Sequence, residues 1–169
     1  PLIRVMALWR AFGARSASGR YPLGFIDFLI EQGPLRAPSV FNFYRPDYAP
    51  PGEMRELGLV APEMQITHEA TTAGLANVLA IWTFVYNSGN ADLRPEDVYI
   101  DLAAESALAG DPGRLVDAVA AKLTGGAISA GLRAELVAMV ERFPSNLGTA
   151  RAAEAVHGIV TAPEYAVLR

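Results

Sequence analysis

The strongest constraint on this fold is a long stretch that suits neither a helix nor a strand. Residues 33–66 contain six prolines and no continuous apolar period. Each proline fixes its own φ angle and disfavours the helical conformation in the residue before it. Loops of this length are uncommon in compact domains and are usually either functional or disordered. Because Phe41, Phe43, Tyr44 and Tyr48 are too apolar for a solvated linker, we expect an ordered segment clamped by its aromatic side chains.

Helical periodicity dominates the rest of the chain. The most extended pattern covers 62–87, where Leu75, Val78, Leu79 and Trp82 fall on one helical face. Over this length a helix would reach about 39 Å, and we expect it to form a central strut. Shorter helices are predicted at 1–14, 25–32, 95–109, 111–123, 129–143 and 165–168, and another runs to 160 from a start at either 146 or 149.

No stretch predicts a strand, so the expected fold is all-α. We interpret 1–169 as a single helical domain built on one long central helix, with a long ordered, proline-rich, non-regular segment. Several helix starts carry capping residues. Asp111 precedes Pro112, Ser129 precedes an apolar stripe, and Thr161 and Glu164 have the spacing of a capping box.

The overall composition excludes several classes of function. The net charge of -4 and the pI of about 5.2 argue against a nucleic-acid-binding face, which needs clustered basic residues. The absence of cysteine excludes disulfides, thiolate nucleophiles and zinc–thiolate sites. No run of about twenty apolar residues is present, so we expect no membrane span. We also predict no cofactor and no metal site.

Three motifs resemble a known family. They are PLRAPSVFNFYRPDYAPPG at 34–52, GLVAPEMQI at 58–66 and TAPEYAVLR at 161–169, and the opening PLIRVMALWRAF is similar as well. In this order they resemble the C-terminal half of the bacterial domain-of-unknown-function family numbered eighteen hundred. Its members often carry export signals and are often encoded beside a second exported, sulfatase-like family. The resemblance implies a periplasmic or extracellular protein with a larger N-terminal half, and it supplies no reaction and no catalytic residue.

The best candidate binding group lies within the proline-rich stretch. It combines hydrogen-bonding side chains, a guanidinium and aromatic faces, which suit a sugar or peptide surface. The alternative, which we favour, is that the aromatic rings fill the core while Arg45 and Asp47 satisfy the loop backbone. His68 is the sixth candidate, although a partly buried, hydrogen-bonded histidine explains it better than a metal ligand. The predicted group is Asn42, Tyr44, Arg45, Asp47, Tyr48 and His68.

Two functional hypotheses follow. The first is a non-catalytic helical module of an exported bacterial protein, which packs against a missing N-terminal half or an exported partner protein. The second is part of a hydrolase-like enzyme acting on extracellular polymer, with a site shared between the missing half and Phe41–Tyr48. If the chain is extended after Pro38, alternation places Phe41 and Phe43 in the core, against the start of the long helix, and Tyr44 and Arg45 nearer the surface.

Overall fold

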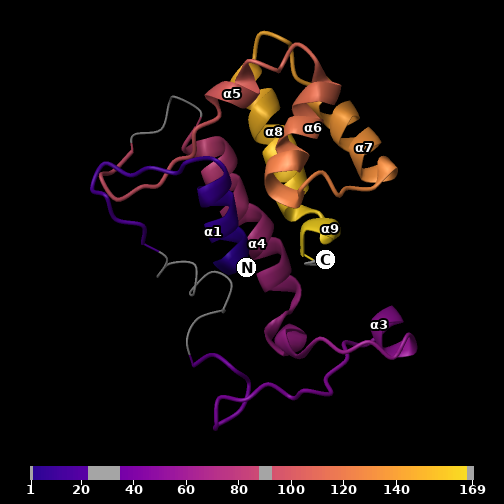
Figure 1. The fold of residues 1–169 in the computed structure, drawn as a ribbon. Coiled ribbons are helices and arrows are strands. Elements are labelled where there is room, and N and C mark those ends of the chain that lie inside the picture. Colours follow the sequence, from indigo (N-terminus) through magenta and orange to yellow (C-terminus); the bar gives the residue numbers. More distant parts are fainter. Residues whose placement is uncertain (1, 23–34, 88–92, 167–169) are drawn as a thin grey trace. The chain divides into compact units, whose positions relative to one another are not determined.

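The computed structural model describes residues 2–22, 35–87 and 93–166 (Figure 1). Within these residues every regular element is a helix, which confirms the all-α prediction. The described chain divides into two compact units. Of the described residues, the helical unit contains 2–22, 76–87 and 93–166, and the proline-rich unit contains 35–75. The short helix predicted at 25–32 lies outside the described residues.

The helical unit contains most of the regular structure. Its elements are α1 (Leu2–Ala11), the π-helical turn η2 (Ile81–Val85), α5 (Ala103–Ser106), α6 (Pro112–Thr124), α7 (Ala130–Glu141), α8 (Gly148–Thr161) and α9 (Pro163–Ala166). The proline-rich unit contains α3 (Glu53–Glu56) and the 3-10 turn η1 (Pro62–Ile66). Helix α4 (Glu69–Ala80) belongs to both units, because the division falls between Leu75 and Ala76.

Helix α8 is the centre of the helical unit. It packs against α5, α6, α7, η2 and α9 (Figure 1). Its inward side chains are mostly small or β-branched, which allows neighbouring helices to approach closely. The fully or almost fully buried apolar residues of α8 are Ala152, Ala153, Ala155, Val156, Ile159 and Val160. The core is therefore organised by a helix near the C-terminus of the sequence.

The prediction of one continuous helix over 62–87 is wrong. The region forms η1, α4 and η2 in succession, and Thr67 adopts an extended conformation between the first two. The Thr71 hydroxyl explains the interruption, because its oxygen accepts a hydrogen bond from the His68 amide at 2.9 Å and donates one to the His68 carbonyl. Such side-chain bonds to the backbone compete with helical hydrogen bonds and begin a new helix instead.

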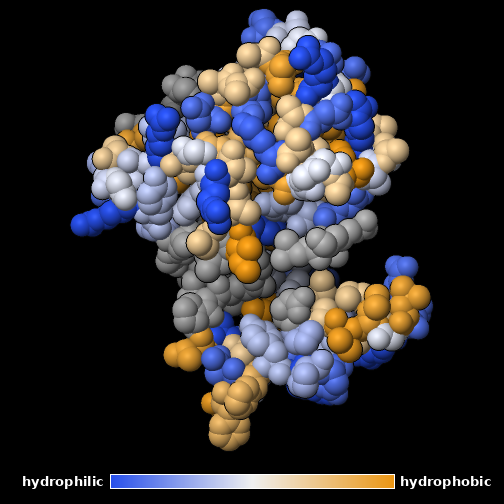
Figure 2. Space-filling model, in the orientation of Figure 1, coloured by the Kyte–Doolittle hydropathy of each residue, from blue (hydrophilic) through white to orange (hydrophobic). Residues whose placement is uncertain are grey.

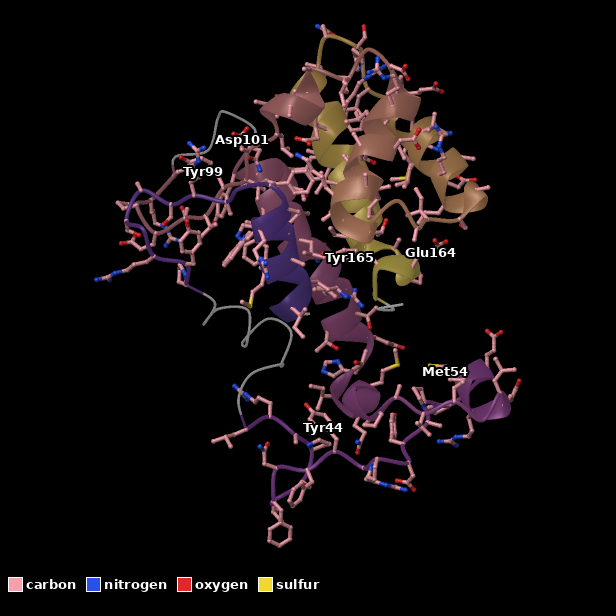
Figure 3. The ribbon with its side chains drawn as sticks, in the orientation of Figure 1. Tyr44, Met54, Tyr99, Asp101, Glu164 and Tyr165 are labelled. Atoms are coloured by element: carbon pink, nitrogen blue, oxygen red, sulfur yellow. The ribbon has the colours of Figure 1, made fainter. Side chains whose placement is uncertain are left out.

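The predicted helix over 95–109 is also much shorter in the structure. Only α5 forms, because the preceding residues pair with the connection after α1. Tyr99 and Arg15 exchange two backbone hydrogen bonds in an isolated antiparallel bridge, and the Asp101 amide donates to the Phe12 carbonyl. Figure 3 shows Tyr99 and Asp101 on this irregular connection. Contacts distant in sequence thus replace the local helix.

The cap predictions have a mixed outcome. Asp111 accepts a hydrogen bond from the Arg114 amide, and Ser129 accepts one from the Leu132 amide, so both N-caps are confirmed. Glu164 instead binds the Ser129 amide at 2.8 Å and the Ser129 hydroxyl at 2.6 Å. The Thr161 hydroxyl donates to the His157 carbonyl at the end of α8. The glutamate therefore ties the α9 turn to the start of α7.

Arg151 and Glu105 are buried charged side chains of the helical unit, and specific partners hold each of them. Arg151 donates to the carbonyls of Phe143 and Ala109, which lie in the connections that follow α7 and α5 respectively. Glu105 is buried, and its Oε1 lies 2.5 Å from the Lys122 Nζ. The same ammonium lies 5.1 Å from the centre of the Phe12 ring. The ion pair thus joins α5 to α6.

We expect Gly158→Ala to lower the free energy of unfolding by about 1–3 kcal/mol, as overpacking does. A Cβ at Gly158 would lie only 2.4 Å from Leu136 Cδ2, where α7 and α8 meet. Gly131→Ala is the matched control, since its Cβ would meet nothing closer than 3.9 Å. The control should be neutral or more stable by up to about 1 kcal/mol, because alanine favours the helix. Urea denaturation of both variants checks this, and equal stability would refute the close contact.

We expect Lys122→Met to destabilise the chain by about 3 kcal/mol, because it leaves the buried Glu105 carboxylate unpaired. The lower end of the range for buried pairs applies, since the Lys122 side chain is 41% exposed. Adding Glu105→Leu to Lys122→Met should restore most of the loss, because the uncompensated charge is then removed. Denaturant titration of the single and double variants measures both effects. A double variant no more stable than the single one would contradict the pairing.

Candidate functional site

The region around Phe41 forms a closed, internally hydrogen-bonded turn. We call residues 35–45 the Phe loop. The Asn42 amide donates to the Ser39 carbonyl at 3.0 Å, and the Asn42 Oδ1 accepts from the Ala37 amide at 3.1 Å. The Ser39 hydroxyl accepts from the Phe43 amide at 2.9 Å and donates to the Phe43 carbonyl at 3.1 Å. Four hydrogen bonds therefore close the turn without help from any other element.

Two residues of the Phe loop adopt the left-handed backbone conformation. Leu35 has φ of 63° and Asn42 has φ of 58°. Asparagine tolerates this region because its short polar side chain bonds locally, as the Asn42 Oδ1 does here. Leucine has no such compensation. Residues held in sparsely populated conformations cluster at ligand clamps and switch regions, so the two angles direct attention to this loop.

The turn presents its apolar side chains to solvent. Val40 is 94% exposed, Phe41 77% and Phe43 71%, while Tyr44 is 37% exposed. The prediction that the two phenylalanines are buried with Tyr44 outside them is therefore wrong. The physical reason is the turn at Ser39–Asn42, which ends the extended alternation assumed after Pro38. Figure 2 shows hydrophobic side chains on the surface of this unit around α3 as well.

The base of the Phe loop is fixed within the proline-rich unit. The Gln65 side-chain amide donates to the Arg45 carbonyl at 3.4 Å, and the Ala61 amide donates to the Tyr48 carbonyl at 2.8 Å. The Arg55 guanidinium donates to the Ala49 carbonyl at 3.0 Å. Figure 3 shows Tyr44 on this irregular segment and Met54 on α3. The prediction of an ordered segment thus finds support in hydrogen bonds, whereas the predicted clamping by buried phenylalanines does not.

The structure separates the predicted binding residues into three roles. Arg45 and Asp47 meet in an exposed ion pair at 3.1 Å, and the hydrogen bond from Arg45 lowers the pKa of the Asp47 carboxyl. The Asn42 side chain accepts a hydrogen bond from the Ala37 amide within the turn. Tyr48 is half-buried, and its carbonyl accepts a hydrogen bond from the amide of Ala61, the residue before η1. A binding role for these residues stays a prediction.

His68 is exposed, and its backbone marks the start of α4 through the bonds with Thr71. The other histidine, His157, is half-buried on α8, where its Nε2 lies 3.2 Å from the Ala76 carbonyl. Its ring also meets the Phe84 ring edge-to-face. Across residues 2–22, 35–87 and 93–166, no group of three or more histidine or acidic side chains is arranged to hold a metal ion.

A second polar cluster lies in the helical unit and has a structural explanation. Asp97 accepts hydrogen bonds from the Tyr86 hydroxyl at 3.0 Å and from the Arg94 amide and guanidinium. The hydrogen bonds from Arg94 lower the pKa of Asp97, and burial raises the pKa of Tyr86. These hydrogen bonds all close the connection between η2 and α5. The cluster therefore holds this connection in place, and its geometry does not resemble an acid–base pair.

Sequence reasoning missed Ser39, which organises the Phe loop. A signal for it was present, because serine is favoured at the first position of a β-turn and asparagine tolerates the left-handed position. The pair Ser39 and Asn42 has that spacing. No helix in the described part of the chain has both the length and the apolar character needed to cross a bilayer.

The comparisons with known proteins identify a family. The model of the family described as "Protein of unknown function (DUF1800)" matches residues 1–167. The chain belongs to the DUF1800 family. The match includes every described residue of both units, so the Phe loop and the helical unit are parts of one family sequence. No curated protein and no solved structure matches the chain. The family description names no reaction, so functional argument rests on the geometry of this structure.

We expect Phe41→Ala and Phe43→Ala to change the free energy of unfolding by less than about 0.5 kcal/mol each, as at other exposed positions. Phe12→Ala is the matched control, because the Phe12 ring is buried and its truncation should cost about 3–5 kcal/mol. Thermal and urea unfolding of the three variants test the contrast. Losses at Phe41 or Phe43 comparable to that at Phe12 would mean that the rings are buried in solution.

Proposed function

We propose that this DUF1800 chain is a non-catalytic helical module that packs, through its proline-rich unit, against the N-terminal half of its own protein or an exported partner protein. We also propose a periplasmic or extracellular location, on the family resemblance of its three motifs. One observation carries the proposal of a packing module. The proline-rich unit exposes large apolar side chains that soluble proteins normally cover.

The exposed side chains are numerous for so small a unit. Between residues 35 and 64 the large hydrophobic residues with more than a third of their surface exposed are Leu35, Val40, Phe41, Phe43, Tyr44, Leu57, Leu59, Val60 and Met64. Among the described residues of the unit, those classed as buried are Ala61 and Thr71. Burial of apolar surface stabilises a complex by roughly 25 cal/mol per Å² before the costs of association. This unit therefore offers a surface that favours association.

One observation favours the second candidate, a hydrolase-like site shared with the N-terminal half. The side chains of Arg45 and Asp47 are both largely exposed, so their charged groups face solvent. Their ion pair would border the covered surface and could contact a polymer substrate there. The present geometry offers no nucleophile and no acid–base pair beside them, so the packing module is the better-supported function.

We expect the purified chain to bind the recombinant N-terminal half of a longer DUF1800 protein in a one-to-one complex. The apolar dye bis-ANS should bind the free chain, and complex formation should displace it because the same surface becomes covered. Isothermal titration calorimetry and sedimentation measure the complex, and a negative heat-capacity change would report apolar burial. An unrelated helical protein of similar size serves as the control partner.

A monomeric chain that binds neither the dye nor the N-terminal half would overturn the packing module. Hydrolysis of a polysaccharide or peptide substrate by the complex, lost in Asp47→Asn, would favour the shared enzyme site instead. Asp47→Asn leaves the exposed rings in place, so its effect separates chemistry from packing.

A further inference from the structure

We propose that the turn from Ser39 to Phe43 is a preformed anchor, whose two phenylalanine rings insert into apolar sockets with an acidic rim on a folded protein partner. The inference rests on the proposed function, and it names the residues and the partner chemistry of that surface. Its basis is a conjunction of three features: a turn that satisfies its own polar groups, apolar side chains at its tip, and arginines beside it.

The turn is closed by its own hydrogen bonds in the chain alone. Asn42 and Ser39 supply the four hydrogen bonds that close it, and Asn42 also accepts the left-handed conformation that the turn requires. A rigid turn loses little conformational entropy on binding, so more of the ring burial appears as affinity. Interface hot spots are typically a few aromatic anchors of this kind.

The hydrogen bonds also restrict how a partner can dock. The amides of Asn42 and Phe43 are already bonded within the turn, so they are not available to extend a sheet. The carbonyls of Tyr48 and Ala49 are likewise occupied, by Ala61 and Arg55. The exposed features of the turn include ring faces and aliphatic surface. Such a surface fits concave apolar sockets and does not fit the edge of a β-sheet.

The charge distribution favours a protein over an anionic membrane. Within residues 35–47 the charged side chains are Arg36, Arg45 and Asp47, and Arg45 pairs with Asp47, so the net charge is +1. A socket with an acidic rim would complement this positive charge. The acidic residues of the same unit are Asp47, Glu53, Glu56, Glu63 and Glu69. An anionic lipid surface would repel these carboxylates, whereas a protein can place an acidic group beside Arg36.

The experiment uses the complete chain and the recombinant N-terminal half of a longer DUF1800 protein as the probe. Phe41→Ala and Phe43→Ala should each raise the Kd by about thirtyfold or more, as expected at hot spots. Ile3→Ala is the matched control, because Ile3 is 69% exposed but lies on α1, and its Kd should stay within about twofold. Circular dichroism and thermal unfolding verify that each variant is folded.

A second pair of variants tests the preformed turn itself. Asn42→Ala keeps both rings but removes the Oδ1 bond and disfavours the left-handed angle, so the Kd should rise by about tenfold. Asn42→Gly restores access to that angle and should recover part of the affinity. Arg36→Gln should weaken binding more at low salt than at high salt, since an acidic rim is screened by ions.

The outcomes are separable. Binding by the unaltered chain that Phe41→Ala and Phe43→Ala leave unchanged overturns this inference and leaves the proposed function standing. Failure of the unaltered chain to bind overturns both. Phe-dependent binding to vesicles of phosphatidylglycerol and phosphatidylcholine, or Phe-dependent dimers of the chain alone in sedimentation, would replace the protein socket with a lipid surface or a second copy.

Discussion

The helical unit depends on the burial of α8. This helix contacts most of the elements around it, and its alanines and Gly158 allow those elements to approach closely. The same helix carries Arg151, whose guanidinium donates to carbonyls just beyond the ends of α5 and α7. A buried guanidinium is stable only when its donors are paired, so these neighbouring helix ends must lie where they do. Packing and hydrogen bonding on α8 thus determine the positions of its neighbours together.

The proline-rich unit is stabilised in a different way. Its irregular backbone is held by hydrogen bonds from Ser39, Asn42, Arg55 and Gln65 rather than by burial of its aromatic rings. Hydrogen bonds between exposed groups stabilise a fold only modestly, because water competes for the same donors and acceptors. The apolar side chains are therefore free for association, which is the physical link between this unit's structure and the proposed function.

The prediction from sequence was most successful where local chemistry decides the structure. Asp111 and Ser129 were identified as caps because a side-chain oxygen satisfies an amide only a few residues away. The continuous helix over 62–87 failed because Thr71 offered His68 an alternative hydrogen-bond partner. The prediction that Phe41 and Phe43 are buried was wrong for a similar reason. The Ser39–Asn42 turn interrupts the alternation on which that prediction relied. Of the predicted binding group, the structure brings together Arg45 and Asp47 and uses Asn42 inside the turn.

The sequence by itself determined the all-α class, the main helix-forming segments and the family, because helical periodicity, capping residues and motifs are all local patterns. The tertiary structure alone decided that α8 forms the centre, that Glu164 caps α7 and that Arg15 pairs with Tyr99. It also decided that the aromatic rings of the Phe loop face solvent. Each of these depends on which distant groups meet, and a local pattern carries no information about that. An apolar side chain is equally suited to its own core and to a partner's surface, so burial follows from the assembled fold.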